Sequence, residues 1–131
     1  MFRSIPPAAG RSQNGDVEAL DATLVLDREQ LKEITMDDQE LMREVLFALI
    51  QDTSQQLVLL DAAIRQQDVD RCMRLAHYSK GACANVGANR AAALLKRMEQ
   101  YAARADFADC AQSLRSLTAE LDLLRQESEV L

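Results

Sequence analysis

The chain of 131 residues contains few of the residues from which metal and redox sites are commonly built. It holds one histidine, no tryptophan and three cysteines, and only 4% of its residues are aromatic. A single histidine excludes a metal site made of several imidazoles, and no metal site is predicted. The odd cysteine count, with no Cys-x-x-Cys pair, fits reduced thiols of a cytoplasmic protein better than a disulfide framework.

Long apolar runs are also missing. No stretch approaches the ~20 apolar residues of a membrane span. The first ten residues contain one arginine and no long apolar segment, so a signal peptide is not expected. The net charge of −6 argues against a general nucleic-acid binder. We therefore expect a cytoplasmic protein whose partners are neither nucleic acid nor membrane.

The residues that are present favour helix. Apolar residues make up 48% of the chain, whereas glycine and proline together number only six. Alanine and leucine are abundant and β-branched residues are few, which favours helix over sheet. Both prolines and two of the four glycines fall within residues 1–22, which we interpret as a flexible N-terminal tail before one domain at 23–131.

Beyond the tail, apolar residues recur with helical spacing, and aspartates stand where helices should begin. The predicted starts are Asp27 for a short helix, then Asp37 or Asp38, Asp68, about Asn89, and Asp106. The inward stripe of the third predicted helix is Val69, Cys72, Ala76, Ser79, Cys83 and Val86, and that of the last is Phe107, Cys110/Ala111, Leu114, Leu117/Thr118, Leu121 and Leu124. Short connections make neighbouring helices antiparallel. The predicted fold is all-α, an up-and-down four-helix bundle with a short extra N-terminal helix.

The single histidine, His77, falls beside the buried stripe of the third helix and should face solvent. Gly81 and Ala84 follow it on the same side, one and two turns later. A glycine inside a helix costs about 1 kcal/mol relative to alanine, and here it leaves room for a partner at the imidazole. Lys80 places an ammonium beside the ring, where it disfavours imidazole protonation and could hold an anion attached to the ring nitrogen.

The charge distribution also points to an anion. Residues 71–104 carry seven basic residues and one acidic residue, a net charge of +6, whereas residues 1–70 carry −8 and residues 105–131 carry −4. A solvated basic helix face would give the same count. The combination with an exposed histidine, a lysine and a glycine favours phosphate chemistry.

The segment Ala76–Ala88, with His-x-x-Lys-Gly followed by small residues and an Asn-x-Gly turn, resembles the signature of histidine-containing phosphotransfer (HPt) domains. The similarity extends over about residues 24–127. The resemblance implies that His77 is phosphorylated on Nε2, that Lys80 stabilises the phosphoryl group, and that Gly81 leaves room for the partner. It makes Gly87 the turn glycine between two helices. Glu99 falls on the helix where some members place a polar residue near the histidine, and Tyr78 is given no role.

The resemblance also implies a mechanism and partners. His77 would relay a phosphoryl group between aspartates of response-regulator receiver domains, in a pathway with a hybrid or sensor histidine kinase. Met73, Arg74, Gly81 and Ala84 are the expected docking residues. The chain has no Gly-rich nucleotide loop and no carboxylate cluster for Mg²⁺. We therefore expect a phosphocarrier without ATP binding, autokinase activity or a cofactor of its own, because the receiver supplies Mg²⁺.

Other functions fit these residues less well. The main alternative is a phosphorylation-independent helical adaptor that binds a receiver domain or sensor kinase through the same surface. A coiled-coil oligomer is disfavoured because the stripes are wide enough to close a bundle within one chain, so we expect a monomer. An enzyme based on Cys72, Cys83 or Cys110 is least favoured, since all three fall on predicted core stripes where thiols are inert.

Overall fold

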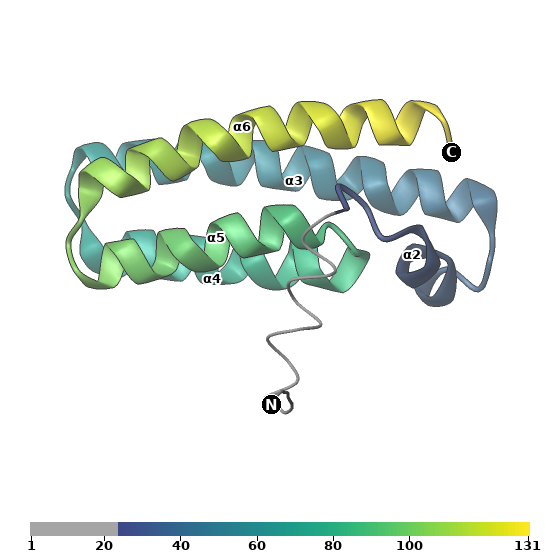
Figure 1. Cartoon of the computed structure of the whole chain (residues 1–131), viewed down its shortest axis with the longest axis horizontal. Helices are drawn as coiled ribbons and strands as arrows, with labels where there is room; N and C mark the ends of the chain where they lie inside the picture. The colour runs from purple at the N-terminus through teal and green to yellow at the C-terminus, as the bar shows by residue number, and fades with distance from the viewer. Residues whose placement is uncertain (1–23) are drawn as a thin grey trace, which may run out of the picture.

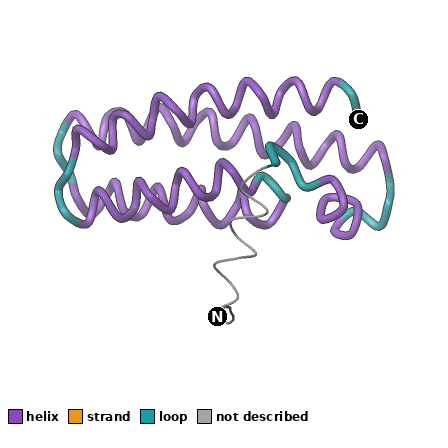
Figure 2. The backbone as a smooth tube through the Cα atoms, viewed as in Figure 1, coloured by secondary structure: helices purple, strands orange, loops and turns teal. Residues whose placement is uncertain are grey.

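A computed structural model describes residues 24–131, so the tail expected at 1–22 lies outside the described residues. The described part consists of helices joined by short connections, with no strand among these residues (Figures 1 and 2). The helices are α2 Arg28–Ile34, α3 Gln39–Arg65, α4 Val69–Val86, α5 Asn89–Ala103 and α6 Phe107–Glu129. Each begins within two residues of its predicted position.

Four of these helix starts are fixed by an aspartate that caps the first turn. Each carboxylate accepts a hydrogen bond from the backbone N–H three residues later, at 3.1–3.3 Å. Such a bond satisfies one of the orphan N–H groups at a helix N-terminus and is typically worth about 1 kcal/mol. The capping residues are Asp27, Asp38, Asp68 and Asp106. Local sequence therefore sets these boundaries.

The four long helices form the predicted up-and-down bundle. α3 packs against α4 and α6, and α5 packs against α4 and α6, so the helices follow one another around a square. α3 and α6 are longer than α4 and α5 and project beyond them at one end, where α2 packs against α3 and α4 (Figure 1). The predicted fold class is confirmed.

Gly87 ends α4 in the left-handed conformation, with φ of 102°. Glycine adopts this conformation without the steric cost that a side chain brings. The chain entering α2 also passes very close: Asp27 N–H donates to the Gly87 carbonyl at 2.9 Å, and a Cβ on Gly87 would lie 2.8 Å from the Asp27 carbonyl oxygen. Gly87 thus makes the α4–α5 turn and also lets the chain at Asp27 pass close against it.

The core matches the predicted stripes closely, with exceptions on α6. Five of the six positions on the α4 stripe are buried, and Val69 is half-buried. On α6, Thr118 is exposed although it was expected inward, whereas Ser113 and Glu120 are buried. Arg90 of α5 donates to the buried Glu120 carboxylate at 3.1 Å. Burial raises the pKa of Glu120, and the guanidinium of Arg90 offsets part of that rise.

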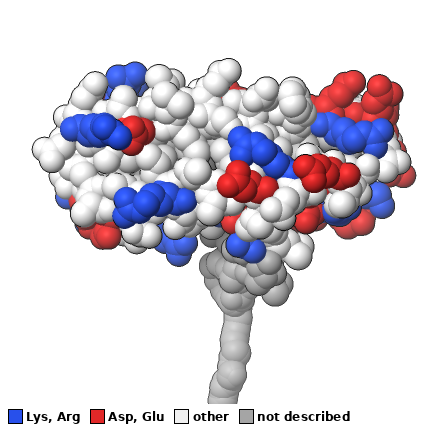
Figure 3. Space-filling view, turned by 90° about the horizontal axis from the view of Figure 1, so that it is seen from above, with Lys and Arg blue, Asp and Glu red and all other residues white. Residues whose placement is uncertain are grey.

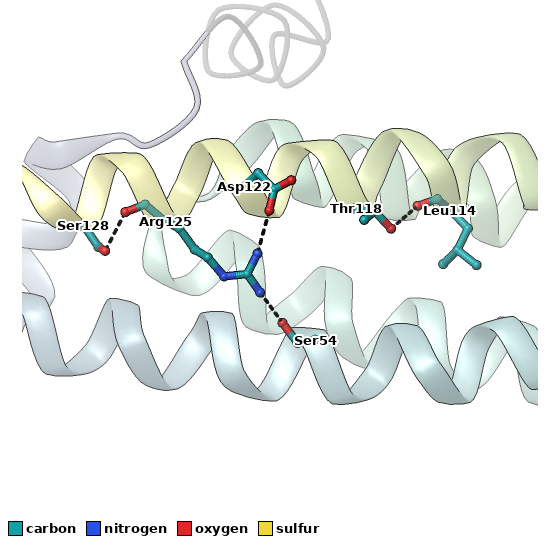
Figure 4. A network of polar contacts seen from close by, with 6 residues as sticks. All are labelled: Ser54, Leu114, Thr118, Asp122, Arg125 and Ser128. Carbon is teal, nitrogen blue, oxygen red and sulfur yellow. Dashed lines mark hydrogen bonds and ion pairs between the residues drawn. The ribbon is translucent and has the colours of Figure 1, made fainter.

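The α3–α6 face is held by polar contacts outside the core. Arg125 of α6 donates to Asp122 at 2.8 Å and reaches across to the Ser54 hydroxyl of α3 at 3.0 Å (Figure 4). On this face basic and acidic groups lie interspersed among uncharged residues (Figure 3).

Across residues 24–131, none of the helices has the length and apolarity needed to cross a membrane.

Candidate functional site

His77 lies in the middle of α4 and points out of the bundle. Its neighbours Ala76 and Ser79 are buried on the core side of the same helix, whereas the His77 side chain is 68% exposed. The helical period therefore presents the imidazole to solvent on a rigid and well-packed element. A partner can reach the ring without any rearrangement of the bundle.

One carboxylate holds both His77 and Lys80. The Nδ1 atom of His77 lies 3.0 Å from Oε2 of Glu99 on α5, and Nζ of Lys80 donates to Oε1 of the same carboxylate at 2.9 Å. Glu99 and Lys80 are partly buried, with 23% and 27% of their side chains exposed. The carboxylate thus anchors Nδ1, and Nε2 is the ring nitrogen that it does not engage.

The surroundings keep Glu99 ionised at neutral pH. Partial burial by itself would raise the pKa of Glu99, but hydrogen bonds from Lys80 and His77 and their positive charge lower it below the usual value. A carboxylate whose pKa is lowered is fully ionised at any pH well above its ordinary pKa. It loses its ionic contacts only when the pH falls through the lowered pKa. The contacts of Glu99 with His77 and Lys80 therefore persist throughout the neutral pH range.

Beside the histidine, the surface is open. An added Cβ on Gly81 would meet no atom within 4 Å, and Ala84 one turn later is also exposed. The two residues line a groove of about 580 Å³ between α4 and α5, together with Lys80, Lys96 and Arg97. The clearance inferred from the sequence at Gly81 is present in the fold, and its rim is cationic.

The other residues expected to dock a partner differ in their exposure to solvent. Arg74 is exposed, whereas Met73 is half-buried and packs against the core. Tyr78, which has no assigned role, is 54% exposed and donates from its hydroxyl to Asp52 of α3 at 3.1 Å. The sequence offers no signal for this last contact, because its two residues come from different helices.

The three cysteines are buried and unpaired with one another. Burial raises the pKa of Cys83 and of Cys110 to about 11, so both thiols stay protonated at neutral pH. A protonated and buried thiol is a poor nucleophile. Within residues 24–131, no group of three or more histidine, cysteine or acidic side chains is placed to hold a metal ion. The cluster around His77 is therefore the candidate functional site.

Comparisons with known proteins point to one family. The Hpt domain family matches residues 44–127, from α3 through most of α6. Among curated proteins, no sequence matches the chain significantly.

Two solved structures share the fold. Histidine-containing phosphotransfer protein B from Pseudomonas aeruginosa is 23% identical, with a TM-score of 0.72 over 82% of this chain and 96% of that one. A putative histidine-containing phosphotransfer protein from rice is 17% identical, with a TM-score of 0.73 over 89% of this chain and 86% of that one. With the family matched over most of the bundle, the chain belongs to the Hpt domain family, whose members are the histidine phosphocarriers of phosphorelays.

Proposed function

We propose that His77 is the phosphorylated residue of this chain and that Nε2 is the atom that carries the phosphoryl group. The observation that carries the proposal is the contact between Nδ1 of His77 and the Glu99 carboxylate at 3.0 Å. An ionised carboxylate only accepts hydrogen bonds, so the ring must carry its hydrogen on Nδ1. In the neutral ring the lone pair is then on Nε2, in a side chain that is 68% exposed.

Transfer then needs only a donor placed in line with Nε2. The nitrogen attacks the phosphorus of an aspartyl phosphate, an N–P bond forms, and the acyl phosphate P–O bond breaks to release the aspartate carboxylate. The imidazole becomes more positive during the attack, and the negative charge of Glu99 offsets that change. In the second half of the relay, another aspartate attacks, the N–P bond breaks, and its electron pair returns to Nε2.

Lys80 supports the bound phosphoryl group in this proposal. Its ammonium is held 2.9 Å from Glu99, one helical turn from His77. A phosphoryl group on Nε2 adds negative charge on the same side, and an ammonium is a strong donor to phosphate oxygens. We expect Lys80 to divide its contacts between Glu99 and the phosphoryl group once His77 is modified.

The partners are those of the family: receiver domains and histidine kinases. We propose that the receiver supplies the aspartate and the Mg²⁺, that the chain itself neither binds ATP nor phosphorylates itself, and that it acts as a cytoplasmic monomer. The basic window of residues 71–104 favours approach of an acidic active site.

The direct test is transfer from a receiver domain charged with a small phosphodonor and Mg²⁺. We expect one phosphate per chain, labile in acid and stable in alkali, located on His77 by peptide mapping. Phosphate on any other residue, or no uptake from any competent receiver, would refute the assignment.

Glu99→Gln tests the role of the carboxylate. Glutamine keeps the shape and an oxygen acceptor for Nδ1 but removes the charge. A hydrogen bond to a charged group is worth about 1 kcal/mol more than a neutral one, so transfer from the receiver to His77 should slow by about fivefold. Single-turnover phosphotransfer measures this directly.

The control variant is Glu129→Gln, which makes the same chemical change on the exposed end of α6 and should leave the rate unchanged. Because the pKa of Glu99 is lowered, the carboxylate stays ionised across the neutral pH range, and the effect of Glu99→Gln should be the same throughout that range. If Glu99→Gln transfers as fast as the wild type, the carboxylate does not act on the ring.

A further inference from the structure

The groove between α4 and α5 begins one helical turn from His77 and extends along both helices. It runs from Lys80 and Gly81 along the helix pair as far as Asn89, and its volume is about 580 Å³. Its lining includes Ala84 of α4 and Ala92 of α5, and Lys96 and Arg97 also line it from α5. A groove lined by small residues and by basic side chains suits an extended acidic segment better than a compact ligand.

The N-terminal part of the chain enters the fold at one end of this groove. Asp27 donates from its backbone N–H to Gly87, and Gln30 donates to the Ala84 carbonyl. Gln30 also accepts from Asn89, which lines the groove. The residues just before Asp27 are therefore tethered next to the groove.

The sequence of that preceding stretch has the complementary charge. Asp16, Glu18 and Asp21 fall within six residues, and no lysine or arginine occurs between Arg11 and Arg28. An extended chain spans about 3.3–3.6 Å per residue. Val25 packs against the core and Leu26 is buried, so the reach is counted back from Leu24, and the six residues from Glu18 to Leu24 can cover about 20 Å. The groove residues Asn89 and Arg97 on α5 are eight residues apart, about 12 Å along a helix. The acidic stretch can therefore reach the cationic rim.

We propose that residues 16–21 of the same chain bind in the α4–α5 groove and pair with Lys96 and Arg97. The segment would then lie over Gly81 and Ala84 and compete with a receiver domain for the open surface beside His77. Tethering raises the effective concentration of the segment, so weak exposed ion pairs suffice. The contact itself is independent of phosphate chemistry, and only its effect on relay rests on the proposed function.

The contact can be tested without any phosphotransfer. A nitroxide placed on Ala19→Cys in the full chain should broaden the amide resonances of Gly81, Ala84 and Ala93 in an NMR spectrum. The native thiols do not interfere, because all three are buried and their pKa values are raised. Broadening should disappear in D16N/E18Q/D21N and also in K96Q/R97Q, which remove the two halves of the charge pairing.

Three outcomes would overturn the contact. The groove amides could stay sharp in the labelled chain. They could broaden equally in both neutralised variants, in which case charge does not direct the contact. They could also broaden when isotope-labelled chain is mixed with spin-labelled chain, in which case a second copy occupies the groove.

The shielding of the surface beside His77 by the acidic segment is measured separately. D16N/E18Q/D21N should accept phosphate from a charged receiver about threefold faster than the wild type at low ionic strength, the effect of two or three weak exposed ion pairs. The difference should vanish at high salt. Equal rates at low salt would overturn the shielding, whereas failure of every variant to accept phosphate would count against the proposed function instead.

Discussion

The His77→Gln variant should accept no phosphate from a charged receiver domain, while it keeps its fold and its affinity for that receiver. Glutamine has a length similar to that of the imidazole and lacks a nucleophilic nitrogen, so the loss of phosphorylation should be complete. The side chain is 68% exposed, and surface substitutions usually change the free energy of unfolding by less than about 0.5 kcal/mol. A loss of phosphate uptake in this folded variant therefore reports on the chemistry and not on the stability of the protein.

The measurement pairs phosphate uptake with receiver binding by calorimetry. Arg115→Gln is a suitable control, because Arg115 is exposed on α6 and this helix does not carry the site. The same variant decides between relay and adaptor. If the pathway output of cells that carry only His77→Gln equals that of the wild type, the protein acts as a phosphorylation-independent adaptor and the relay proposal fails.

Replacement of Gly81 by leucine should block transfer and at the same time stabilise the helix. A Cβ at this position meets no atom within 4 Å, so the free protein accommodates the new side chain. Removal of a mid-helix glycine should raise the free energy of unfolding by up to about 1 kcal/mol. The leucine would occupy the surface that a receiver must approach, and a clash of about 1.4 kcal/mol or more reduces transfer at least tenfold.

Gly81→Ala is the matched variant, since it gives the same helix stabilisation with one methyl group and should transfer at a rate between those of the wild type and Gly81→Leu. Circular dichroism with urea unfolding reports stability, and single-turnover transfer reports the clearance. If Gly81→Leu transfers phosphate at the wild-type rate, no partner passes close to this residue.

The sequence alone determines the helices of this protein and the face on which His77 lies. Asp27, Asp38, Asp68 and Asp106 cap their helices through bonds to N–H groups three residues away, so each boundary depends on one short stretch. The buried stripe through Cys72, Ala76 and Cys83 sets the rotation of α4 and with it the exposure of the histidine. These features were predictable because they require only local bonds and helical period.

The tertiary structure decides what surrounds His77. Sequence spacing places Lys80 beside the ring as a cation, but in the bundle its ammonium pairs with Glu99 from α5, and the same carboxylate holds Nδ1 of His77. Glu99 is 22 residues from His77 in sequence, so their contact depends on how α4 and α5 are rotated against each other. The pair Tyr78–Asp52 depends in the same way on α3 and α4.

The same reason explains the errors on α6. Helical spacing placed Thr118 inward, yet it is exposed, and Glu120 is buried although its charge predicts the surface. A partner on another helix, Arg90, offsets part of the cost of burying that carboxylate. Periodicity fixes which residues share a face, because that is a property of one helix. Which atoms meet across two faces is a property of the packed bundle, and the ring nitrogen left free on His77 is decided there.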